Sequence, residues 1–164
     1  MSIKSVKINI LLVDDHQLVI DGLKSMISAG KHLLVSGEAL NGQQAIDIIM
    51  ADPQKYQLVI TDITMPLMGG VELCKLIKQQ FSHIKVLMLS MHNSISIIKD
   101  SLTAEADGYM LKNTGQEEFL KGIERIIGDG TYFSQEILPI ILNQFQKEKP
   151  LINKSSLTQR EKEV

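Results

Sequence analysis

Five short apolar runs alternate with longer amphipathic stretches along the 164 residues of this chain. The runs are rich in leucine and β-branched side chains, and they are Ile8–Val13, Leu33–Ala39, Leu58–Ile60, Lys85–Leu89 and Gly108–Leu111. Strands that alternate with helices form βαβ units, in which helices cover both faces of a parallel sheet. Five such units predict an α/β fold, a doubly wound five-stranded parallel sheet with the flavodoxin-like strand order.

The stretches between the runs have apolar residues at helical spacing, as after the first run at Leu18, Leu23, Met26 and Ile27. Two of the predicted helices also have recognisable starts. Asn41 is expected to cap the second helix with its side chain. Thr114 and Glu117 have the spacing of a capping box in front of the last one.

The charge of the chain gives no sign of direct nucleic-acid binding. Its formal net charge is −2, and Arg125 and Arg160 are its only arginines. A domain that binds DNA or RNA by neutralising phosphates usually shows a basic stripe. We find no such stripe, so this stretch of protein is not expected to bind nucleic acid by itself.

The N-terminal apolar run is too short for a targeting or membrane segment. Asp14 and Asp15 end the run Ile8–Val13 far short of a secretory signal core or a membrane span. Cys74 is the only cysteine, which excludes an intrachain disulfide. These features predict a soluble, cytoplasmic protein.

Polar side chains stand where four of the predicted strands end. Asp14 and Asp15 follow the first strand, Asp62 the third, Ser90 the fourth and Lys112 the fifth. The carboxyl ends of parallel strands meet at one edge of the sheet, which is where ligands bind in such folds. We therefore expect these side chains to form one site.

Three carboxylates at one edge repel one another unless cations compensate them. Lys112 supplies one positive charge, and Mg²⁺ suits the remaining oxygen ligands. A carboxylate beside a metal ion, a lysine and a hydroxyl is equipped to accept a phosphoryl group as an acyl phosphate. Asp62 is the candidate acceptor, with Lys112 and Ser90 contacting the phosphoryl oxygens.

The chain changes character after residue 130. Residues 131–145 have the apolar pattern of one further helix, and the polar residues 146–156 are typical of an interdomain linker. Residues 157–164 contain a second capping box, which predicts the first turn of another helix. We expect residues 1–130 to form the main domain, and the chain to be part of a longer protein.

The motifs "LLVDDH", "TDITMP", "LMLS" and "GYMLK" together resemble the receiver domain of two-component response regulators, over Lys7 to about Gly128. This resemblance implies a CheY-like receiver fold. "GDGTYFS" and "SSLTQREKEV" further resemble response regulators with a LuxR-type helix-turn-helix output domain. If so, residues 157–164 are the start of a DNA-binding domain that is mostly absent from this chain.

The resemblance assigns roles at the expected site. It implies that Asp62 accepts the phosphoryl group from a phosphohistidine of a sensor histidine kinase. Asp15, helped by Asp14, would hold Mg²⁺ together with Asp62 and the backbone carbonyl of Thr64. Such a protein is a phosphoacceptor switch rather than an enzyme, and it is expected to form a homodimer when phosphorylated.

The resemblance also implies how the switch would work. Lys112 would contact the phosphoryl group, Ser90 would swing toward it, and the ring of Tyr109 would follow inward. Two positions depart from the usual family pattern. Met91 is bulkier than the small residue common there, which predicts slower access to Asp62. Asn113 replaces a common proline, which leaves open whether the Lys112–Asn113 peptide bond is cis.

Other functions remain open on the sequence. A freestanding receiver would signal through protein contacts alone. A phosphatase with Asp62 as nucleophile would need a second carboxylate two residues later, where Thr64 stands. A flavin-binding domain would need a phosphate-binding loop after the first strand. The segment that follows this strand, "DDHQL", has two negative charges and no glycine. A metal-binding role for His16 or His92 is a minor alternative, because imidazole suits softer metals than Mg²⁺.

Overall fold

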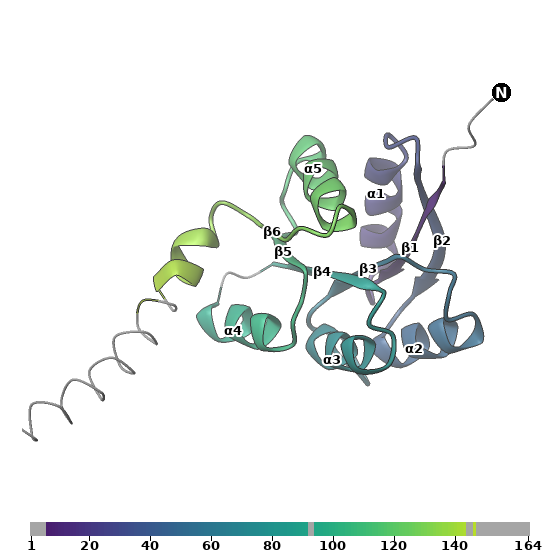
Figure 1. Ribbon diagram of the computed structural model, residues 1–164, viewed down its shortest axis with the longest axis horizontal. Coiled ribbons are helices and arrows are strands. Elements are labelled where there is room, and N and C mark those ends of the chain that lie inside the picture. The colour runs from purple at the N-terminus through teal and green to yellow at the C-terminus, as the bar shows by residue number, and fades with distance from the viewer. Residues whose placement is uncertain (1–5, 92–93, 144–145, 147–164) are drawn as a thin grey trace, which may run out of the picture. The chain divides into compact units, whose positions relative to one another are not determined.

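Six parallel strands form one sheet in a computed structural model, which describes residues 6–91, 94–143 and 146 (Figure 1). The strand order is β2-β1-β3-β4-β5-β6. The strands are β1 (Ile8–Val13), β2 (Leu33–Ala39), β3 (Leu58–Asp62), β4 (Lys85–Ser90), β5 (Gly108–Leu111) and β6 (Tyr132–Phe133). The order of the first five confirms the flavodoxin-like prediction.

Helices cover both faces of the sheet (Figure 1). Helices α1 (Gln17–Ile27) and α5 (Gln116–Ile127) lie on one face, and α2 (Gly42–Ala51), α3 (Gly70–Gln80) and α4 (Ile95–Thr103) lie on the other. All five residues of β3 are buried, as expected for a central strand between two helical layers. The apolar runs of the sequence therefore reflect burial on both faces.

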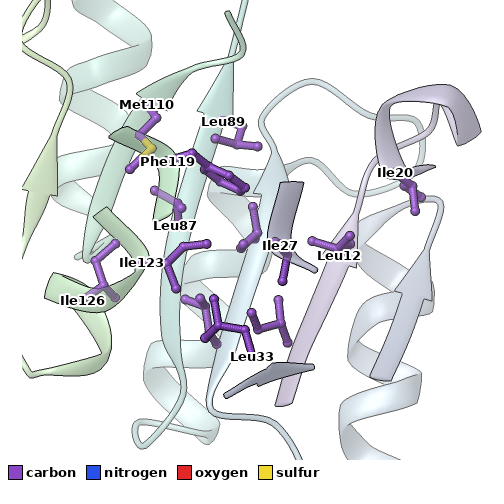
Figure 2. Close-up of a cluster of buried hydrophobic side chains, with 13 residues drawn as sticks. Leu12, Ile20, Ile27, Leu33, Leu87, Leu89, Met110, Phe119, Ile123 and Ile126 are labelled. Atoms are coloured by element: carbon purple, nitrogen blue, oxygen red, sulfur yellow. The ribbon is translucent and has the colours of Figure 1, made fainter. Parts of the chain in front are cut away.

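The hydrophobic cluster in Figure 2 joins α1 and α5 to the sheet. Phe119, Ile123 and Ile126 of α5 belong to the same buried cluster as Leu87 and Leu89 of β4. Each fully buried side chain of this kind contributes about 1.5–3 kcal/mol through removal from water. This packing holds the strand ends in place beneath the loops that follow them.

The prediction of five strands is corrected by β6, a strand of two residues within the segment expected to be helical. Tyr132 donates its N–H to the carbonyl of Asp107 at 3.1 Å, and Tyr132 and Phe133 pair in parallel with Gly108 and Tyr109. A strand this short leaves no periodicity in the sequence.

The extra helix predicted over residues 131–145 begins later than expected. The first compact unit of the chain ends at Ser134 and a second begins at Gln135, and within the latter residues 138–143 are helical. Residue 146, the first residue of the expected linker 146–156, is also helical. The rest of that linker lies outside the described residues, as does the start of a DNA-binding domain expected at 157–164.

The two predicted helix starts differ in outcome. Asn41 caps α2, because its side-chain oxygen accepts the N–H of Gln44 at 2.9 Å. The capping box at Thr114 is wrong: the Thr114 hydroxyl instead donates to the carbonyl of Leu111 at 2.6 Å, and Gly115 is the N-cap of α5.

The described residues contain no cis peptide bond, so the bond between Lys112 and Asn113 is trans. Among the helices of the described residues, none is both long and apolar enough to cross a membrane.

Candidate functional site

The sheet brings the polar strand ends together as the sequence predicted. Asp14 directly follows β1, Asp62 ends β3, Ser90 ends β4 and Lys112 directly follows β5. These four strands are consecutive neighbours in the sheet. Pairing continues past the strand ends, since the Lys112 N–H donates to the carbonyl of Ser90 at 2.8 Å.

The ammonium group of Lys112 lies between two carboxylates. Its Nζ is 2.8 Å from Asp14 Oδ2 and 3.2 Å from Asp62 Oδ2. The three side chains are only 11%, 2% and 10% exposed, respectively. Burial lowers the pKa of Lys112, but the hydrogen bonds and charges of Asp14 and Asp62 outweigh it and raise that pKa above its usual value. Lys112 is therefore a fixed positive charge at the site.

One backbone group and one side chain hold the Asp62 carboxylate in place. One oxygen accepts the N–H of Ile63 at 2.8 Å, while the other faces Lys112. Burial raises the pKa of Asp62, the nearby charge of Asp14 adds to this, and Lys112 only partly offsets the two. The site thus contains more negative charge than Lys112 alone compensates.

A further residue joins the acidic cluster. Ligand atoms of Asp14, Asp15, His16 and Asp62 all lie within 4.8 Å of one another. His16 Nδ1 is 3.3 Å from Asp14 Oδ1 and 3.2 Å from Asp15 Oδ1. The sequence had raised His16 only as a minor metal-binding alternative, and its place directly after the two aspartates accounts for its position here.

The carboxylate oxygens of this cluster are the ligand type that Mg²⁺ prefers. The donor set therefore fits the metal that the sequence suggested. Thr64 is exposed in the loop after β3, and the role of its carbonyl stays a prediction. His92 lies outside the described residues.

Ser90 and Tyr109 form a buried pair beside the carboxylates. They are 3% and 1% exposed, and their side chains are hydrogen-bonded to each other. Burial raises the pKa of Tyr109, and the hydrogen bond from Ser90 partly opposes this effect. The family resemblance implied that the ring of Tyr109 moves inward when the site is phosphorylated. In this structure the ring is already buried.

Comparison with known proteins gives a consistent picture. The family model described as the response regulator receiver domain matches residues 10–124. The transcriptional regulatory protein MctR of Rhizobium johnstonii is 34% identical over 158 residues, which cover 96% of this chain and 71% of that protein. The nitrate/nitrite response regulator protein NarL of Escherichia coli is 28% identical over 157 residues, covering 94% of this chain and 72% of that protein.

Solved structures agree with the fold. The crystal structure of a LuxR-family two-component response regulator from Aurantimonas sp. SI85-9A1 superposes with a TM-score of 0.78 at 27% identity, over 84% of this chain and 97% of that one. The isolated receiver domain of RcsB from Salmonella enterica has a TM-score of 0.74 at 22% identity, over 82% of this chain and 98% of that one.

Proposed function

The chain belongs to the response regulator receiver family, and on this premise we propose that Asp62 accepts a phosphoryl group from a phosphohistidine of a sensor histidine kinase. The observation that supports this most is the placement of Asp62, with Lys112 at 3.2 Å and an acidic cluster beside it. A salt bridge between Asp62 and Lys112 with a purely structural role would not need the two additional carboxylates of Asp14 and Asp15.

The transfer forms one bond and breaks another. An oxygen of the Asp62 carboxylate attacks phosphorus as the phosphorus–nitrogen bond of the phosphohistidine breaks. The electron pair of that bond goes to the ring nitrogen, and a proton on the other ring nitrogen lets the histidine leave as neutral imidazole. The product is an acyl phosphate on Asp62. Lys112 contributes a positive charge next to the new phosphoryl oxygens, and the Ile63 N–H orients the carboxylate.

Asp14, Asp15 and Asp62 would hold Mg²⁺, together with the backbone carbonyl of Thr64. When bound, the metal ion supplies positive charge that offsets the crowded carboxylates and the incoming phosphoryl oxygens. The raised pKa of Asp62, caused first by burial and then by Asp14, supports a need for such a cation.

The output would be regulation of transcription. We propose that Ser90 and Tyr109 report the phosphoryl group, and that residues 157–164 begin a LuxR-type DNA-binding module joined by a linker at 146–156. Phosphorylation would favour a homodimer, and DNA would be bound only through that module. The names of the relatives, a transcriptional regulatory protein and a nitrate/nitrite response regulator, support this reading.

Intact mass spectrometry tests the proposal directly. After incubation with Mg²⁺ and acetyl phosphate, the protein should gain one phosphoryl group, which chelation of Mg²⁺ and the variant Asp62→Asn should both abolish. An adduct that persists in Asp62→Asn would refute Asp62 as the acceptor. Rapid turnover of a phosphate ester in place of a stable adduct would favour the phosphatase alternative.

A further inference from the structure

Ser134 lies directly after β6, ten residues beyond the segment that the receiver family model matches. It is completely buried. Its N–H donates to the carbonyl of Tyr109 at 3.0 Å, and its hydroxyl oxygen accepts the N–H of Leu111 at 3.3 Å. Ser134 therefore binds β5 at two backbone groups, one on each side of Met110.

The opposite edge of this part of β5 is bound to β4. The N–H of Lys112 donates to the carbonyl of Ser90 at 2.8 Å. The end of β5 is thus held between Ser90 on one side and Ser134 on the other. This short stretch includes Tyr109 of β5, which is hydrogen-bonded to Ser90, and it is followed directly by Lys112, which pairs with Asp62.

We propose that Ser134 is a positioning residue for Tyr109 and Lys112, and that it couples the state of the Asp62 site to the chain that continues at Gln135. A shift of the β5 end that accompanies phosphorylation would alter both hydrogen bonds of Ser134. By thermodynamic reciprocity, loosening Ser134 would change the affinity of the site for a phosphoryl group. The inference rests on the function proposed above.

Other contacts hold β6 in place without Ser134. The Tyr132 hydroxyl donates to Glu118 Oε1 of α5 at 2.9 Å, and the Tyr132 N–H donates to the carbonyl of Asp107. The variant Ser134→Ala removes only the hydroxyl acceptor and keeps the backbone bond to Tyr109. We therefore expect this variant to fold with β6 still paired to β5.

The test combines hydrogen exchange with binding of beryllofluoride, a phosphoryl mimic, in the presence of Mg²⁺. In the unaltered protein, beryllofluoride should change the exchange rates of the Tyr132 and Ser134 amides by about threefold or more, an effect that a purely structural clamp would not show. Ser134→Ala should speed exchange at Leu111 by about fivefold, because one hydrogen bond is lost. It should also weaken beryllofluoride binding by about threefold or more.

Ser101→Ala is the matched control. Ser101 is 2% exposed, and its hydroxyl donates to the carbonyl of Ile97 within α4 rather than to a group of β5. This variant should bind beryllofluoride as the unaltered protein does. If beryllofluoride binds while the β6 amides and the affinity of Ser134→Ala stay unchanged, the inference is overturned and the proposed function stands. If the unaltered protein fails to bind beryllofluoride, the proposed function fails, and the inference with it.

Discussion

The hydroxyl of Tyr109 is hydrogen-bonded to that of Ser90, and both residues are almost completely buried. In the proposed function, the Ser90 hydroxyl donates to the phosphoryl group on Asp62. Tyr109 and a phosphoryl group therefore compete for the same hydroxyl. The affinity of the site for a phosphoryl group should therefore depend on the free energy needed to break the hydrogen bond between Tyr109 and Ser90.

The variant Tyr109→Phe removes one partner of this pair while keeping the ring. We expect it to bind beryllofluoride in the presence of Mg²⁺ about fivefold more tightly, because one hydrogen bond of about 1 kcal/mol no longer has to be broken. Titration monitored by NMR would measure the affinity. Tyr56→Phe is the control, since it likewise loses a buried hydroxyl, one that donates to the carbonyl of Ser36 in β2. Weaker binding by Tyr109→Phe would show that the Tyr109 hydroxyl supports the bound state instead.

Asp62 should lower the stability of the metal-free protein. Its pKa is raised, first by burial and then by Asp14. Below the ordinary pKa of 3.8 the carboxyl is protonated in both the folded and the unfolded state, and the folded protein buries no charge. As the pH rises through the raised pKa of the folded state, the folded protein has to bury the ionised carboxylate, and this part of its stability is lost. At neutral pH in a chelator, Asp62→Asn should therefore be more stable by about 1 kcal/mol.

Urea unfolding at several pH values measures this difference. The gain of Asp62→Asn should shrink toward acid pH, and Mg²⁺ should stabilise the unaltered protein more than the variant. Asp100→Asn is the control, because Asp100 is exposed on α4. A loss of stability in Asp62→Asn at neutral pH would mean that the pair with Lys112 outweighs burial.

Lys112 should be essential for stability when no metal ion is bound. Lys112→Met leaves Asp14 and Asp62 buried without their cation, which should cost about 3 kcal/mol. Added Mg²⁺ should restore part of that loss, so the variant should gain more from Mg²⁺ than the unaltered protein does. Thermal unfolding with and without Mg²⁺ would measure both effects.

The pH dependence gives an independent check on Lys112. Its raised folded pKa means that its contribution is complete below the ordinary 10.5 and is lost as the pH rises through the folded value. Lys112→Met should lack this alkaline loss, whereas Lys99→Met, at an exposed position of α4, should retain it. If Lys112→Met and the unaltered protein lost stability equally at alkaline pH, the raised pKa of Lys112 would be contradicted.

The sequence predicted the convergence of Asp14, Asp62 and Lys112 because it depends only on strand order and on residues next to strand ends. Such topology follows from hydrophobic periodicity and from the rules for parallel sheets. The features that it missed depend on local choices between hydrogen-bond partners. Thr114 had the spacing of a capping box, yet its hydroxyl found the nearer carbonyl of Leu111.

β6 and Ser134 were missed for a different reason. Two residues are too few to show a period of two, so Tyr132–Phe133 could not be told apart from the start of the next helix. Likewise, the inward position of Tyr109 is a side-chain conformation, which residue spacing does not determine. The first feature depends on the close approach of Tyr132 to Gly122, and the second on the hydrogen bond between Tyr109 and Ser90, and only the folded chain brings these residues together.

Gly70 should be required for the geometry of Asp62. A Cβ at Gly70 would lie 2.2 Å from the backbone carbonyl oxygen of Asp62, and backbone at the end of a central strand cannot move aside easily. Gly70→Ala should therefore shift α3 or the end of β3, and it should destabilise the protein by about 1–3 kcal/mol. Because the same shift displaces the Asp62 carboxylate, the variant should also bind Mg²⁺ more weakly.

Gly22→Ala provides the matched control for this substitution. Gly22 lies within α1, and a Cβ there would meet no atom within 4 Å. Since alanine favours the helix over glycine, Gly22→Ala should be more stable by about 0.5–1 kcal/mol. Urea unfolding and Mg²⁺ titration of both variants would separate the close contact from a general effect of alanine. If Gly70→Ala were as stable and bound Mg²⁺ as well as Gly22→Ala, then α3 could move without disturbing Asp62, and the requirement for glycine at residue 70 would be refuted.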